Sequence, residues 1–326
     1  MWIEIIVSSL VIYRLVRRFF YDDEQQDQHI DFGSSSSSNA LFSVADRLKS
    51  LYGGKAYVGL RIPDPDTSSL QNIDLVLVTK GEAVVVSVIN ASGIVNIEGD
   101  GTWVCSGGSK HKTERLQDPI AEAKRQVAVL ESYLEQRGVA LPDGYISYKI
   151  VCPNEKFRTV HPDYFKPEVV TYEQWAELKP EKKGLFGWIK GALHIDKNEM
   201  GSIQQSLSFT LSTAPMWDRL ELKNNKRLLG EFLEFKGKQD DVVSLRNIKR
   251  SKVSRMIIQS TSMFGLAHSK LQVLYAPRDY RSEGASVSEL DEVTVRSSTE
   301  VLFQLKDTDK VQKIKLSSII SMSLSP

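Results

Sequence analysis

Two neighbouring segments of the chain place a single carboxylate beside an uncharged run. Asp74 is the only acid in NIDLVLV (72–78), and AVVVSVI (83–89) carries no charge. A metal-dependent site that cleaves phosphodiesters needs an acid on one strand and a second acid two residues before a lysine on the next. The two acids hold Mg²⁺, and the lysine orients or activates the attacking water. Asp74 therefore raises the question of what its neighbouring strand supplies.

Both segments have the composition of strands, because they are rich in β-branched residues and have strand length. Their lack of polar alternation predicts central strands that are buried on both faces. Further strands are predicted at 56–62 and 145–152, a hairpin at 94–97 and 102–105, and a strand leading into a short helix at 167–178.

Two helices are expected beside these strands. One covers 41–51. The other begins after Asp118, an N-cap followed by Pro119 at the first helical position, and ends at Gly138. Apolar residues at a spacing of three to four give this second helix one buried face.

Several separated blocks of this region resemble a known family, and they occur in the same order as in that family. The run IDLVLVTKGEAVVVSVINASGIV, then DGTW, then DPIAEAKRQVAVL is similar to the NERD (nuclease-related) domain, and most similar to its plant-type members. The resemblance covers about 51–177. It implies an α/β restriction-endonuclease-like domain with a mixed sheet.

The resemblance transfers the family's site only in part. The aspartate position falls on Asp74 and the helix glutamine on Gln126, so these two residues are the remnant of a catalytic site. Ser87 stands at the glutamate position and Ile89 at the lysine position. Asn90, Gly93 and Trp103 also match, whereas Lys55 stands where the family often has glutamate.

This departure predicts a degenerate, non-catalytic site. One carboxylate beside a serine hydroxyl is a poor Mg²⁺ site, and Ile89 supplies neither a proton nor a positive charge. No cofactor is expected unless the protein is active, in which case Asp74 would hold Mg²⁺. Asp74 would otherwise cap the strand turn or pair with a lysine such as Lys55. The alternative is a Mg²⁺-dependent nuclease acting on DNA or RNA, in which Glu82 or Glu98 replaces the lost acid.

Length and composition set the frame. The 326 residues are enough for about two domains, and 41% hydrophobic with 25% charged residues is a globular composition. A formal net charge of +1 gives no global attraction to nucleic acid or anionic membranes. Two cysteines form no disulfide framework, and the five histidines lack metal-ligand spacing.

The N-terminus carries an apolar helix at 1–20 that is expected to anchor the protein to a membrane through residues 2–20. Arg14, Arg17 and Arg18 follow the apolar run, so the body would be cytosolic. An amphipathic helix packed on a soluble intracellular body, or a cleaved targeting peptide, are the alternatives. An acidic and serine-rich linker is predicted at 21–40.

The rest of the chain is predicted to form two domains joined by a linker. The NERD-like domain is expected at 41–180 and a linker at 181–205. The linker includes KKGLFGWIKGALH, which would be a packed connection or an amphipathic surface helix. Short strands separated by turns predict an all-β small barrel or sandwich at 206–326.

Two basic segments are candidates for phosphate or nucleic-acid contact. Lys110, Lys112 and Arg115 lie before a helix N-terminus, and RNIKRSKVSR (246–255) follows in the β-rich region. A solvated loop and a solvated face are the alternatives. A membrane-linked trafficking or signalling adaptor, in which the NERD-like part is only a scaffold, is the third function the sequence allows, and nothing in the sequence identifies its partner.

Overall fold

The computed structural model describes Tyr13 and residues 32–107, 113–159, 164–179, 197–261, 270–278, 290–306 and 308–325. Apart from Tyr13, the expected anchor at 2–20 lies outside these residues, as does the lysine- and aromatic-rich segment before residue 197. Among the helices that the structure describes, none is both long and apolar enough to cross a bilayer.

The N-terminal region is built around a mixed five-stranded sheet with the order β1-β2-β3-β7-β9. The first three strands are antiparallel, and β7 and β9 continue the sheet in parallel. Its strands are β1 (Lys55–Pro63), β2 (Leu70–Val78), β3 (Ala83–Val88), β7 (Ile146–Val151) and β9 (Val169–Val170). The α/β architecture and the two central strands are thus as predicted.

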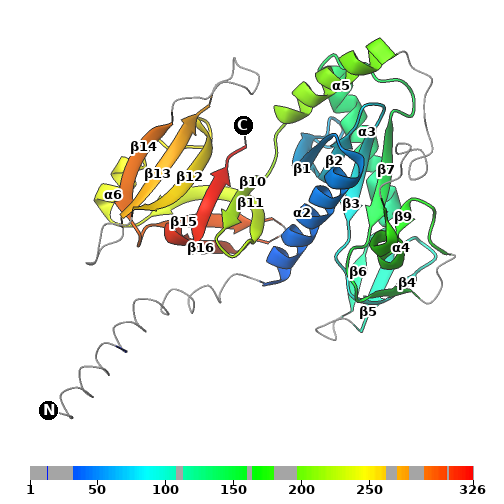
Figure 1. Cartoon of the computed structure of the whole chain (residues 1–326). Coiled ribbons are helices and arrows are strands. Elements are labelled where there is room, and N and C mark those ends of the chain that lie inside the picture. Colours follow the sequence, from blue (N-terminus) through cyan, green and yellow to red (C-terminus); the bar gives the residue numbers. More distant parts are fainter. Residues whose placement is uncertain are drawn as a thin grey trace.

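Helices cover both faces of this sheet (Figure 1). Alternate residues of β2 explain why: Val76 and Val78 pack towards α3 (Pro119–Gln136) and α5 (Lys197–Ser212), whereas Leu75 and Leu77 pack towards α2 (Phe32–Tyr52). The cap of α3 is as expected, because the Asp118 carboxylate accepts hydrogen bonds from the first backbone N–H groups of the helix. The short α4 (Tyr172–Glu177) follows β9.

A second, smaller sheet lies at one end of this region. It has the order β6-β5-β4-β8 and contains the expected hairpin. Its strands are β4 (Gly93–Ile97), β5 (Trp103–Ser106), β6 (Glu114–Leu116) and β8 (Phe157–Thr159).

Two predicted boundaries were wrong. Residues 32–40 belong to α2 rather than to a linker, because tertiary contacts hold the serine-rich turns: Ser38 is buried, and the Asn39 side chain accepts from the Arg227 backbone N–H at 2.9 Å. Residues 197–212 form α5 rather than linker and strand. Its apolar residues are sparse, but Leu207 and Leu211 are fully buried on the first sheet.

The C-terminal region is a curled, antiparallel sheet of eight strands in the order β14-β13-β12-β17-β10-β11-β15-β16. It is a half-barrel, and the sandwich alternative is wrong. Its strands are β10 (Asp218–Leu222), β11 (Arg227–Lys236), β12 (Val253–Thr261), β13 (Lys270–Pro277), β14 (Asp291–Arg296), β15 (Glu300–Leu305), β16 (Val311–Lys315) and β17 (Ile319–Ser323), with α6 (Gln239–Ser244) and the short η4 (Leu316–Ser318) between strands.

The two regions share one apolar cluster. Figure 1 shows α2 between the five-stranded sheet and the C-terminal sheet, and Leu229 and Trp217 pack into the α2 cluster. The backbone of Gly59 accepts from Trp217 N–H at 2.8 Å. Gly59 has φ +74°, and a Cβ there would lie 3.3 Å from a Leu229 methyl. A glycine is therefore needed where the regions meet closely.

Candidate functional site

Asp74 is held by the C-terminal region. Its Oδ1 lies 2.6 Å from Nζ of Lys306, and its Oδ2 accepts from the backbone N–H of Val88 at 3.0 Å. The two charged side chains are 24% and 13% exposed. Lys306 is itself fixed to β11, because its backbone N–H donates to Leu229 O at 2.9 Å. The expectation of a lysine partner is confirmed, but the lysine comes from 232 residues away and is not Lys55.

Ser87 and Ile89 flank Val88, whose backbone N–H bonds to Asp74, but they contribute no charge. Ser87 Oγ donates to Gln126 Oε1 at 3.2 Å, so Gln126 of α3 contacts this strand. Ile89 packs in the apolar cluster under the small sheet, beside Ala91 and Cys152. The strand therefore offers one hydroxyl, already engaged, and one hydrocarbon side chain.

Glu122 is a residue near this site that sequence reasoning missed. Its Oε1 accepts from Gln71 Nε2 at 2.7 Å and from Gln126 Nε2 at 3.4 Å, and Arg125 also bonds to its carboxylate. A chain of hydrogen bonds thus runs from Ser87 through Gln126 to Glu122. The signal was present in the sequence, because residues four apart on a helix share a face.

The groups around Asp74 do not fit Mg²⁺, the metal that the nuclease resemblance implies. Hard divalent cations bind several oxygen ligands that compensate their charge. Here both oxygens of Asp74 are engaged, one of them by a cation. Within the described ranges, no three or more His, Cys, Asp and Glu side chains gather into a set that could hold a metal ion.

The two acids proposed to restore the site lie elsewhere. Glu82 is in the turn that joins β2 and β3, beyond the Val78–Ala83 pair, whereas Asp74 lies towards the opposite end of the strand pair. Burial raises the pKa of Glu82 to about 7 by disfavouring the charged carboxylate. Glu98 lies in the hairpin of the small sheet and pairs with Arg115.

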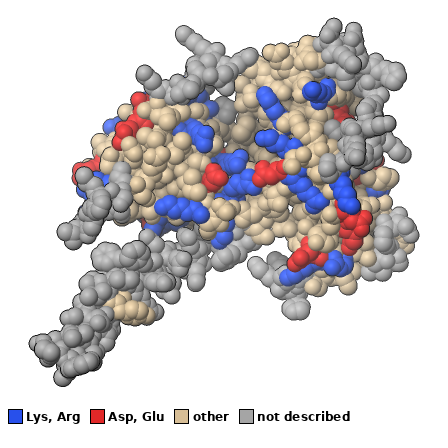
Figure 2. Space-filling view, viewed as in Figure 1, with Lys and Arg blue, Asp and Glu red and all other residues tan. Residues whose placement is uncertain are grey.

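The candidate phosphate-binding residues are only partly described. Lys110 and Lys112 lie outside the described residues. Arg115 is 60% exposed, but its guanidinium is engaged by Glu98. On the face drawn in Figure 2, Lys and Arg side chains are scattered among acidic ones and form no broad basic surface.

The second basic segment divides between two environments. Arg250 turns inward, where its Nε donates to the buried Asp218 at 3.2 Å and its Nη1 bonds to Glu231 at 2.9 Å. Arg246 and Lys249 remain exposed and line a cavity in the C-terminal region.

Comparison with known families identifies the first region. Residues 36–153 match the family model of NERD, the nuclease-related domain. The match covers α2, the central strands and α3, and confirms the resemblance at the level of this domain. None of the comparisons supports the narrower, plant-type resemblance. No curated protein and no solved structure matches the chain. The chain thus contains a region similar to nuclease-related domains, joined to a half-barrel.

Proposed function

We propose that this protein is a non-catalytic binding or scaffolding protein whose NERD-like region keeps a restriction-endonuclease-like fold and a degenerate site. The observation that carries the proposal is the Asp74–Lys306 contact. A cation from another region occupies the carboxylate that a nuclease would offer to its metal.

The chemistry of the contact supports this interpretation. An ammonium–carboxylate hydrogen bond is stronger than one between neutral groups, and both partners here are largely shielded from water. A metal ion would have to displace Lys306 before it could bind, and would then find no second carboxylate at Ser87. The backbone bond from Lys306 to Leu229 further opposes withdrawal of the lysine.

The fold assignment rests on the sheet. An antiparallel β1-β2-β3 unit is followed by α3 and by β7, which is parallel to β3. Asp74 lies on the second strand, Ser87 on the third and Gln126 on the following helix, and this arrangement supports the proposed fold.

Membrane attachment belongs to the proposal through residues 2–20 and the basic residues Arg14, Arg17 and Arg18. The body would then lie on the cytosolic side, and the partner would be a nucleic acid or another protein. Fractionation of the full chain against a variant lacking 2–20 tests this. We expect the full chain in the membrane pellet and the truncated chain in the supernatant. Equal distribution of both would favour the soluble intracellular alternative.

One observation favours the alternative, a Mg²⁺-dependent nuclease with a relocated acid. The carboxylate of Glu122 accepts a hydrogen bond from Gln126, and Gln126 in turn bonds to Ser87, which stands at the glutamate position of the family. It is a better candidate than Glu82 or Glu98. Its Oε1 already accepts from Gln71, however, and Arg125 neutralises its charge.

A cleavage assay on the full chain separates the two functions. The substrates are plasmid DNA, single-stranded DNA and RNA, each with Mg²⁺ and with Mn²⁺. We expect no cleavage by the unmodified protein. Cleavage that disappears in Asp74→Ala and Glu122→Gln, but persists in the matched control Glu98→Gln, would establish the nuclease. A further variant combines Ser87→Glu and Ile89→Lys with Lys306→Ala, and any cleavage it gains would identify a scaffold that has lost its chemistry.

A further inference from the structure

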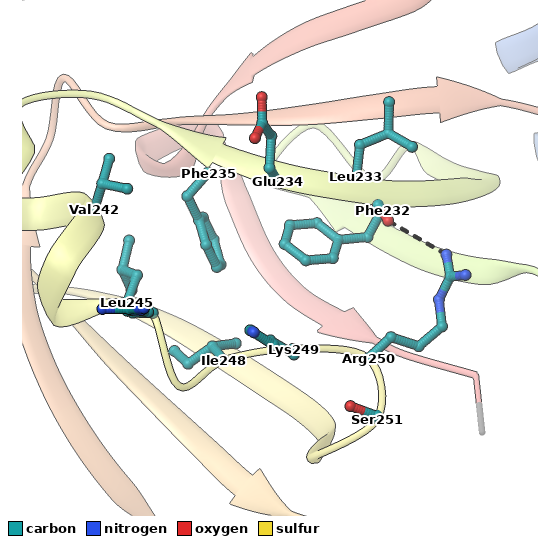
Figure 3. Close-up of a pocket in the computed structure, with 11 residues that line it drawn as sticks. Phe232, Leu233, Glu234, Phe235, Val242, Leu245, Ile248, Lys249, Arg250 and Ser251 are labelled. Atoms are coloured by element: carbon teal, nitrogen blue, oxygen red, sulfur yellow. Dashed lines mark hydrogen bonds between the residues drawn. The ribbon is translucent and has the colours of Figure 1, made fainter.

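The C-terminal region contains a cavity of about 660 Å³ that the NERD-like site does not use (Figure 3). It lies between β11 on one side and α6 with the following turn on the other. Its volume falls in the range of small-molecule sites, roughly 300–1,000 Å³. The cavity is partly open to solvent.

A β-bulge creates the aromatic wall of this cavity. Residues three apart on a regular strand point to opposite faces. The pairing of β11 with β15 shifts between Phe232 and Glu234, which leaves Leu233 as the extra residue. Phe232 and Phe235 therefore face the same side, with ring centroids 5.0 Å apart. Figure 3 shows both rings on one side of β11, and Leu233 and Glu234 on the other.

The opposite wall is also apolar. Val242 comes from α6, and Leu245 and Ile248 come from the turn that follows it. Leu245 and Ile248 are 1% and 3% exposed, so they are anchored in the core of the half-barrel. A ligand would thus find hydrocarbon on two sides, and its apolar part would be withdrawn from water.

The rim is positively charged. Arg246 and Lys249 line the cavity and are exposed, and neither forms an ion pair with an acid in the described part of the chain. Arg250 also lines the cavity, but Asp218 and Glu231 neutralise it. The one acid of the lining, Glu234, points away from the rings in Figure 3. The free charge at the rim is therefore cationic.

We infer that this cavity binds a small anionic amphiphile, a molecule with one negatively charged head group on an apolar chain or ring. The apolar part would lie between the two phenylalanines and the α6 wall, and the head group would meet Arg246 and Lys249. This site is independent of the proposed function of the NERD-like region, and the basic segment 246–255 acquires a role that does not require nucleic acid.

Binding of decanoate to the full chain, measured by titration calorimetry, tests the inference. Decanol, which has the same chain without the charge, is the comparison ligand. We expect decanoate to bind with one site per chain and decanol to bind at least about tenfold more weakly, because the rim cations would contact the carboxylate. Equal affinities for decanoate and decanol would show that Arg246 and Lys249 do not contact the head group, and would overturn the proposal of an anionic ligand.

Two variants locate the site. Arg246→Glu with Lys249→Glu reverses the rim charge on exposed side chains, and should weaken decanoate binding by about tenfold or more. Lys252→Glu with Arg255→Glu is the matched control, because both residues are exposed in the same basic segment but do not line the cavity. Equal losses in the two variants would show general electrostatic attraction and no defined site.

A third variant, Val242→Trp, fills the cavity from a partly exposed position on α6 and should abolish binding of both ligands. Near-ultraviolet circular dichroism of each variant verifies the fold.

Vesicles of anionic phospholipid, tested alongside, distinguish a monomeric ligand from a bilayer surface. Binding to vesicles without binding to decanoate would overturn the cavity site in favour of membrane docking through the exposed Leu233 and Val243.

Discussion

The site around Asp74 and the cavity of the half-barrel treat charge in opposite ways. At the first, the carboxylate of Asp74 forms an ion pair with Lys306, and the side chains of Ser87 and Gln126 form a hydrogen bond with each other. At the second, Arg246 and Lys249 lie beside apolar walls and form no ion pair with an acid among the described residues. The charged and polar groups of the first site thus have partners within the chain, whereas two cations at the second site remain for a ligand to contact.

This difference has a physical basis. A shielded charge without a partner costs several kcal/mol, so a partly buried carboxylate such as that of Asp74 is expected to have a counter-ion. Exposed cations carry no such cost, because water solvates them until a ligand arrives. Three experiments sharpen or break the comparison, in order of decreasing expected effect.

The largest effect is expected for Asp218→Ala, which removes the anchor of the cavity wall. Asp218 is 1% exposed and accepts from Phe232 N–H at 2.7 Å, from Ser325 N–H at 2.8 Å and from Arg250. Its loss removes the acceptor of both backbone N–H groups and one of the two carboxylates that hold Arg250, so the free energy of unfolding should fall by about 3–5 kcal/mol. Urea unfolding measures it. Asp240→Ala, at a position 87% exposed, is the control and should change stability little. A small loss for Asp218→Ala would mean that water replaces the carboxylate and that the wall is not rigid.

The second effect concerns Glu82 of the NERD-like region, which forms no ion pair with a cation among the residues that the structure describes. The folded-state pKa of Glu82 is about 7 against an ordinary 4.5, because burial disfavours its charged form. The folded protein therefore binds more protons than the unfolded chain between these values, and stability falls as pH rises through them. Glu82→Gln should raise the free energy of unfolding by about 1–3 kcal/mol above pH 7 and leave it nearly unchanged below pH 4.5.

Urea unfolding at a pH on each side of this window measures the difference. Glu135→Gln, on an exposed position of α3, is the control and should shift stability by less than about 0.5 kcal/mol at both pH values. If the free energy of unfolding of Glu82→Gln differs from that of the unmodified protein by the same amount at both pH values, Glu82 is ionised and solvated. It would then again be a candidate acid for a metal site.

The smallest effect is the coupling between Asp74 and Lys306. A double-mutant cycle with Asp74→Asn and Lys306→Met should give a coupling energy of about 1–2 kcal/mol, because the pair is close and partly buried. The cycle of Glu98→Gln and Arg115→Gln is the exposed control, with an expected coupling below about 1 kcal/mol. Equal coupling in the two cycles would mean that Lys306 does not hold Asp74, and would weaken the argument for a closed site.

Much of the first region could be predicted because its signals are local. β-Branched runs indicated β2 and β3, and Asp118 with Pro119 fixed the start of α3. The errors have one cause in common. The serine-rich start of α2 and the sparse apolar positions of α5 carry little local preference, and each helix is stabilised by packing on a distant surface.

The sequence by itself determined that the strand after Asp74 carries neither an acid nor a lysine, because residue identity from 83 to 89 needs no structure. Only the tertiary structure decided what Asp74 contacts, since Lys306 reaches it by the packing of two regions that are far apart along the chain. The same holds for the cavity. A bulge set by the pairing of β11 with β15 turns two phenylalanines to one face, and no local preference of the sequence specifies that register.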